Sequence, residues 1–179
     1  TIVAQLGSGI NGALNPGSGD FTGKLVPGAQ HINDLITRVN GGVTEIYAAV
    51  GANYYAGAYI GGDSYGLYKS VDNGGTWTKL SLPLTANGNE YTPNDIAIAA
   101  DNKVWIGTTS TTTTGDGGGK VLASTDANGV TFEDKYTVTD GRRVQIVASN
   151  TDKDKIFLLA QGTGSSPVIM IKTVGSFNS

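Results

Sequence analysis

The sequence has no cysteine, which excludes disulfide bonds and thiolate metal sites. His31 is its only histidine, so neither a histidine metal cluster nor a catalytic triad with a second histidine can form. Charged residues make up only 15% of the chain, and the formal net charge is −3. A phosphate-binding surface normally carries clustered lysine and arginine, and here arginine occurs only at positions 38, 142 and 143. We therefore expect no nucleic-acid partner.

Long apolar runs are absent as well. No run approaches the roughly 20 apolar residues of a membrane helix, so no membrane insertion is expected. Residues 1–6 lack a positively charged start, so we expect any export signal to have been removed or to lie outside this segment. No stretch shows convincing helical spacing of apolar residues, whereas glycine is abundant, with 27 residues. Many short strands joined by glycine-rich turns fit this composition, and we predict an all-β fold.

Internal repetition divides most of the chain into three units. Each unit consists of short runs rich in valine, isoleucine and aromatic residues, and turn residues bound every run. Ser70, Ser124 and Thr173 occupy matching positions roughly 50 residues apart, which is the size of a four-stranded β-propeller blade. We predict blades over residues 32–84, 92–139 and 142–179, the last of them incomplete.

The third unit lacks a run that would form its fourth strand, and an unpaired strand edge invites aggregation. We therefore expect these blades to be part of a larger propeller, completed by residues 1–31, by another chain or by the rest of a longer polypeptide. Residues 1–31 are interpreted as a strand followed by a Gly/Pro-rich connection that closes or joins a neighbouring blade. The Thr/Gly-rich loop at residues 110–119 is expected to be mobile.

One motif is specific. The segment Ser70-Val-Asp72-Asn-Gly74-Gly-Thr76-Trp77 fits the pattern Ser-x-Asp-x-Gly-x-Thr-Trp at every fixed position. Ser70 and Asp72 carry short polar side chains that can accept hydrogen bonds from the N–H groups of a turn. Gly74 can adopt a positive φ without a Cβ clash, and Trp77 begins the returning strand and buries its ring.

This motif resembles the Asp box, or BNR repeat, of sialidases, sortilin-type receptors, photosystem assembly factors and bacterial surface propellers. The resemblance implies a turn between the third and fourth strands of a blade, with a structural role for its aspartate. A second, degenerate copy has one extra residue and phenylalanine in place of tryptophan, so we expect a bulged turn there; its motif residues are Ser124, Asp126, Gly129, Thr131 and Phe132. The third copy, beginning at Thr173, has lost the aspartate.

Signals for a cofactor or metal are weak. Gly7-Ser-Gly9-Ile-Asn-Gly12 matches the dinucleotide fingerprint, but the following Ala-Leu-Asn-Pro-Gly cannot open the required helix. Asp152 and Asp154 alternate in a turn and could ligate calcium, although a solvated turn fits them better. We therefore predict no cofactor and no metal site. We also predict no catalytic residue, because the sialidase arginine triad and a marked catalytic carboxylate are both missing.

Tyrosines in one loop are the best candidates for ligand contact. Tyr54, Tyr55 and Tyr59 lie between the second and third strands of the first predicted blade, and aromatic faces in loops can stack on sugar rings. Trp105 would extend this platform if it points outward. The alternative is that the tyrosines pack their loop onto the neighbouring blade.

These features lead to three functional hypotheses. The first is an adhesion or binding module of a secreted or cell-surface bacterial protein, which contacts a glycan or a protein through rim loops. The second is part of a sialidase-like glycoside hydrolase whose catalytic residues lie mostly outside this segment. The third is a structural or assembly propeller. The extracellular location follows from the family resemblance and the composition alone.

Overall fold

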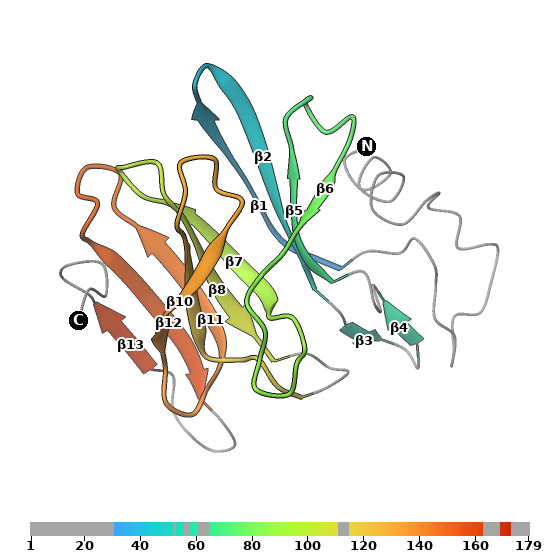
Figure 1. Cartoon of the computed structure of the whole chain (residues 1–179). Helices are drawn as coiled ribbons and strands as arrows, with labels where there is room; N and C mark the ends of the chain where they lie inside the picture. Colours follow the sequence, from blue (N-terminus) through green and yellow to red (C-terminus); the bar gives the residue numbers. More distant parts are fainter. Residues whose placement is uncertain are drawn as a thin grey trace.

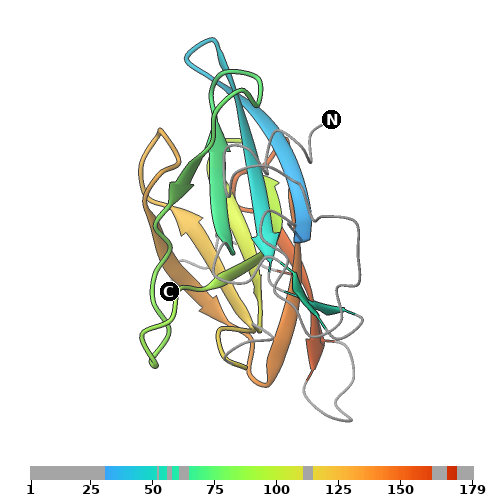
Figure 2. The same ribbon diagram turned by 90° about the vertical axis from the view of Figure 1, so that its right-hand side faces the viewer.

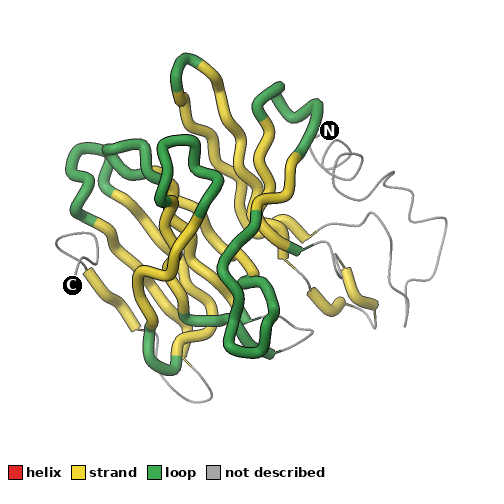
Figure 3. The backbone as a smooth tube through the Cα atoms, viewed as in Figure 1, coloured by secondary structure: helices red, strands yellow, loops and turns green. Residues whose placement is uncertain are grey.

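The computed structural model describes residues 31–51, 53–55, 58–60, 65–110, 115–162 and 169–172, and this part of the chain contains strands and no helix. The all-β prediction is confirmed (Figure 3). No helix long and apolar enough to cross a membrane occurs in these ranges. Residues 1–30, with the predicted first strand and the Gly7–Gly12 signal, lie outside the described residues, as does the third motif copy at Thr173.

Three antiparallel sheets follow one another along the chain (Figure 1). In each sheet, neighbouring strands follow one another in the chain, except where the separate hairpin β3–β4 is inserted between β2 and β5. The first sheet contains β1 (His31–Asn40), β2 (Val43–Gly51), β5 (Gly66–Ser70) and β6 (Thr78–Leu80); the inserted hairpin contains β3 (Asn53–Tyr55) and β4 (Ala58–Ile60). The second contains β7 (Thr92–Ile98), β8 (Val104–Thr109), β9 (Lys120–Ser124) and β10 (Phe132–Thr137); the third contains β11 (Gly141–Ala148), β12 (Ile156–Gly162) and β13 (Ile169–Lys172).

The second sheet is sandwiched between the other two (Figures 1 and 2). Because side chains alternate along a strand, Ile96 and Val104 pack against the first sheet, whereas Ala97, Trp105 and Ala123 pack against the third. The partners on the first sheet include Tyr47, Ala49 and Leu67, and those on the third include Val144, Ile146, Ile156 and Leu158. Two apolar layers therefore join the three sheets, one at each face of the second.

Each sheet carries an aromatic residue at the same position of its second strand. Tyr47 on β2 and Trp105 on β8 both point toward the next sheet along the chain, and Phe157 holds the corresponding position on β12. Trp105 is only 1% exposed. It therefore cannot join a surface platform, and the condition that it points outward is not met.

A polar clasp fixes each sheet to the next. The β1 bulge at Asn33 and Asp34 and the β7 bulge at Asn94 and Asp95 present the same pair of side chains. Asn33 Nδ2 donates to the carbonyl of Pro93 at 2.9 Å, and Asp34 Oδ2 accepts from Ile96 N at 2.9 Å. One sheet later, Asn94 Nδ2 donates to Val144 O at 2.8 Å, and Asp95 Oδ2 accepts from Ile146 N at 2.7 Å.

Because successive strands run in opposite directions, the connections between them lie at two opposite ends of the sheets. The turns β1–β2, β5–β6, β7–β8, β9–β10 and β11–β12 lie at one end, called here the turn end. The inserted hairpin β3–β4, the β6–β7 connection and the β8–β9 loop lie at the opposite end, called the loop end. Figure 1 shows the turn end at the top and the hairpin at the bottom right.

Candidate functional site

The first turn (residues 70–77) joins β5 to β6 at the turn end. Ser70 Oγ accepts a hydrogen bond from Gly74 N at 2.9 Å and donates to Asp72 Oδ1 at 2.8 Å. Asp72 in turn accepts from Thr76 N at 2.8 Å and from the Thr76 hydroxyl at 2.7 Å. The predicted hydrogen bonds of Ser70 and Asp72 to the N–H groups of their own turn are thus present.

Gly74 and Trp77 complete the hydrogen bonding of the first turn. Gly74 has φ of +85°, a conformation that favours glycine. The Trp77 indole is buried and donates from Nε1 to Gly74 O at 3.1 Å. Hydrogen bonds from the backbone and side chain of Thr76, and from Ser70, lower the pKa of Asp72 to about 2. The Asp72 carboxylate is therefore held ionised by the turn that it closes.

Replacing Ser70 with alanine is expected to destabilise the protein by about 1–3 kcal/mol, because it leaves the buried Gly74 N–H without its acceptor. Chemical denaturation measures this loss. Ser81→Ala, at an exposed position, is the matched control and should change stability by less than about 0.5 kcal/mol. Equal stability of the two variants would contradict a structural role for Ser70.

The second turn (residues 124–132) joins β9 to β10. Asp126 Oδ2 accepts from Thr131 N at 2.7 Å and also from the Thr131 hydroxyl. Burial raises the pKa of Asp126, but hydrogen bonds from Thr131 and Val130 outweigh it and lower the value to about 2. Ser124 differs from Ser70, since its Oγ accepts from Val104 N on the neighbouring strand at 3.0 Å. The extra residue lies within the turn, and the nearest strand bulge comes later, between Asp134 and Tyr136.

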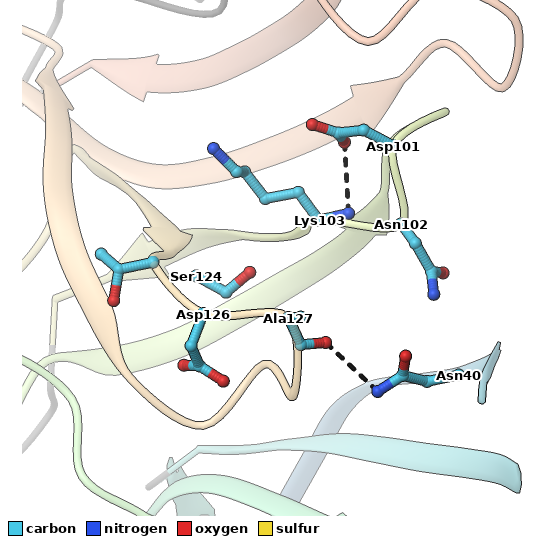
Figure 4. A pocket seen from close by; sticks show the side chains of 8 residues that line it. Asn40, Asp101, Asn102, Lys103, Ser124, Asp126 and Ala127 are labelled. Atoms are coloured by element: carbon cyan, nitrogen blue, oxygen red, sulfur yellow. Dashed lines mark hydrogen bonds between the residues drawn. The ribbon is translucent and has the colours of Figure 1, made fainter.

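A hollow of about 260 Å³, lined mostly by residues with polar side chains, separates the second turn from the ends of β1 and β7 (Figure 4). Its lining residues come from three connections: Asn40, Asp101, Asn102, Lys103, Ser124, Thr125, Asp126 and Ala127. Asn40 Nδ2 donates across the hollow to the Ala127 carbonyl at 3.2 Å, as Figure 4 shows. This hollow is the candidate site at the turn end.

A buried ion cluster lies next to this hollow, and Asn40 links the two by donating to Glu45 Oε1 at 3.2 Å. Glu45 pairs with Arg38 Nε at 2.7 Å and with Lys69 Nζ at 2.8 Å, and all three side chains are at least nine-tenths buried. The Tyr47 hydroxyl lies 2.8 Å from Glu45 Oε2. Burial raises the pKa of Glu45, but hydrogen bonds from Lys69, Arg38, Tyr47 and Asn40 bring it down to about 2.

The same cations hold the turns of the second sheet. Arg38 donates to the carbonyls of Asn102 and Ala127, the latter at 3.0 Å, and Lys69 donates to Asn128 O at 2.6 Å. Gly129, with φ of +63°, lets the second turn approach closely, because a Cβ there would lie 2.5 Å from the Tyr47 hydroxyl oxygen. The ion cluster therefore acts as a structural anchor, and the turn carbonyls that it holds are already occupied.

The carboxylates at the turn end accept hydrogen bonds from the backbone of their own turns. No group of three or more histidine, cysteine, aspartate or glutamate side chains that could hold a metal occurs in the described ranges. Asp152 accepts from Asp154 N at 3.1 Å and pairs with Lys155 at 3.0 Å, so its oxygens serve the β11–β12 turn. The two motif aspartates are likewise committed to their own turns.

The predicted tyrosines lie at the loop end. Register pairs Tyr54 with Tyr59 and Tyr55 with Ala58 in the hairpin β3–β4, so the three tyrosines share one two-stranded element. Their side chains fall outside the described part of the structure. The hairpin and the two Asp-containing turns are thus at opposite ends of the molecule (Figure 1).

A second polar cluster orders the loop end. Asp116 Oδ2 accepts from Thr85 Oγ1 at 2.8 Å, from Asn87 Nδ2 at 3.1 Å and from Asn89 Nδ2 at 3.2 Å. Gly118 packs so closely that a Cβ there would lie 2.6 Å from Arg142 O. Residues 115–119 therefore make close contacts on both sides; residues 111–114 of the loop that is expected to be mobile lie outside the described part.

Two features of the site were missed by sequence reasoning. The ion cluster gives no local signal, because Arg38, Glu45 and Lys69 lie on three different strands. The clasp does give one, since the dipeptide Asn-Asp occurs at Asn33 and again at Asn94, each time at the start of a sheet. No protein-family model matches the chain, and no curated protein does either.

Proposed function

We propose that the three sheets are consecutive blades of an Asp-box β-propeller. Each complete sheet is a four-stranded meander built from one continuous segment, and each stacks on the next by an apolar layer and a clasp. The turn that resembles the Asp box joins the third and fourth strands of its sheet, which is the place the resemblance implies. In this arrangement Asp72 and Asp126 serve structure.

We propose further that the chain is a binding module of a secreted or cell-surface bacterial protein, with a glycan or protein ligand held at the loop end. The observation that supports this best is the inserted hairpin β3–β4, which places Tyr54 opposite Tyr59 at that end. Tyrosine offers a large apolar face with a polar tip, which suits recognition surfaces. The polar loop held by Asp116 lies at the same end.

The double variant Tyr54→Ala/Tyr59→Ala tests the site. Ligands are first found by screening immobilised glycans and candidate surface proteins with the intact protein, and affinity is then measured by calorimetry. We expect the double variant to bind at least tenfold more weakly, which corresponds to about 1.4 kcal/mol. Asp101→Ala/Lys103→Ala, in the turn-end hollow, is the control and should leave affinity unchanged.

The opposite pattern would contradict the proposal. Loss of binding in the Asp101/Lys103 variant alone would move the site to the turn end. Hydrolysis of a bound glycan would favour the glycoside hydrolase alternative, and a co-purifying assembly partner without glycan binding would favour the structural one.

A further inference from the structure

The outer face of the third sheet, defined by Gln145, Val147, Phe157 and Leu159, is apolar and open. Val147 is 65% exposed, Phe157 38% and Leu159 39%. A mainly apolar hollow of about 360 Å³ is lined by the same residues together with Asp95 and Leu158. Exposed clusters of large apolar side chains mark interaction surfaces in proteins.

The sequence of β12 fits burial on both faces. A strand with one face in water normally alternates apolar and polar residues, whereas a strand covered on both sides is a continuous apolar run. Residues 156–160 read Ile-Phe-Leu-Leu-Ala, with no polar residue among them. In the second sheet the inner strand β8 is buried on both faces over Val104–Gly107, while in β12 every second residue is exposed. The composition of β12 is therefore typical of a strand whose outer face is also buried.

Residues on the outer face of the third sheet correspond in register to the residues with which each earlier sheet contacts the next one. Phe157 pairs with Val147 as Trp105 pairs with Ala97. Gln145 pairs with Leu159 as Asp95 pairs with Gly107. An aromatic ring thus stands at the same contact position, and an amide that can accept a hydrogen bond stands where the clasp carboxylate stood.

We propose that a fourth sheet of the same repeat, belonging to the same polypeptide, packs on the outer face of the third sheet. Its innermost strand lies over Val147 and Phe157 and donates a backbone N–H to the Gln145 side-chain oxygen, as Ile146 donates to Asp95. This inference rests on the blade arrangement proposed above and is independent of ligand binding. It continues an interface that the chain already uses twice.

The fourth sheet lies farther out than the third does from the second. At Gly107 the strands approach so closely that a Cβ would be 2.5 Å from Val144 O, whereas the corresponding Leu159 carries a full side chain. Gln145 is one methylene longer than Asp95, so its amide reaches across the wider gap. The two differences are consistent with one another.

A second copy of the chain does not fit this face by the same packing. The copy would have to offer the face of its first sheet that points away from its second sheet. On that face Ala48 and Val50 are fully buried, and Tyr68 is 5% exposed. The surface that would meet the third sheet is already covered within the chain.

Single cysteine substitutions test the proposal, because residues 1–179 contain no cysteine and mass spectrometry reports the new thiol by the peptide that carries it. Val147→Cys reports the outer face, and Val71→Cys, at a turn position with 56% exposure, is the matched control. Both variants are made in the full-length polypeptide that the gene encodes, and native labelling by a maleimide is followed by mass spectrometry. We expect Val147→Cys to be labelled at least tenfold more slowly than Val71→Cys, with equal rates after denaturation and protection that does not change on dilution.

Equal native rates would overturn the proposal, and protection that falls on dilution would replace the fourth sheet with a second copy. Protection that is lost when residues 1–30 are deleted would replace it with that segment of this chain. Leu159→Cys repeats the measurement if Val147→Cys fails to fold. Protection of the thiol in Val147→Cys does not depend on the tyrosine hairpin, so failure of ligand binding and failure of this inference give different results.

Discussion

Replacing Glu45 with alanine is expected to lower the free energy of unfolding by about 3–5 kcal/mol at neutral pH, because the change leaves two buried cations without their counter-ion. Arg38 and Lys69 both pair with Glu45, and each also donates to a carbonyl of the second turn, which keeps both cations in this buried position. Urea or guanidinium denaturation gives the number directly.

Glu133→Ala is the matched control. Glu133 also pairs with a lysine, Lys135, at 2.6 Å, but it is exposed. An exposed pair contributes about 0–1 kcal/mol, so this variant should stay close to the parent protein. Similar losses in the two variants would show that the buried cluster is not a special anchor.

Acid provides an internal check on the Glu45 result. The folded protein holds the Glu45 pKa at about 2, below the ordinary 4.5, so folding favours the ionised form. Its stabilisation is complete above the unfolded pKa and is lost as pH falls from about 5 toward 2. The stability gap between the parent and Glu45→Gln should therefore shrink over that range. A gap that stays constant would contradict the ion pairing.

The parts of the structure that were predictable from sequence are those set by local rules. Strand-forming runs between turn residues predicted the all-β fold, and the spacing of Ser70, Asp72 and Gly74 predicted the hydrogen bonds of one turn. These depend on residues that are close in the chain. The second turn shows the limit, because Ser124 fits the same motif yet bonds to Val104, on another strand.

The parts that were missed depend on contacts between sheets. Arg38 meets Ala127 across 89 residues, and no periodicity within either segment encodes that meeting. The orientation of Trp105 is of the same kind, since an aromatic residue in an alternating strand can face either side. The register with Ala97 and the packing of the third sheet decide it, and both are tertiary facts.

Trp105 is accordingly expected to behave as a core residue rather than as a ligand contact. Trp105→Ala should cost about 3–5 kcal/mol, because it opens a cavity between the second and third sheets where the ring contacts buried side chains of both. Trp105→Phe keeps an aromatic ring at the position that holds Tyr47 in the first sheet and Phe157 in the third, so it should cost less. Denaturation of the three proteins measures the order.

Ligand-binding measurements distinguish an aromatic residue that contacts the ligand from one that packs in the core. Folded Trp105→Phe should bind the ligand found by screening with unchanged affinity, because the ring is 1% exposed and cannot touch it. A stability loss below about 1 kcal/mol for Trp105→Ala, together with weaker binding by Trp105→Phe, would indicate that Trp105 lies at the surface and contacts the ligand. The expected pattern instead assigns recognition to the inserted hairpin and assigns to Trp105 the packing of one sheet on the next.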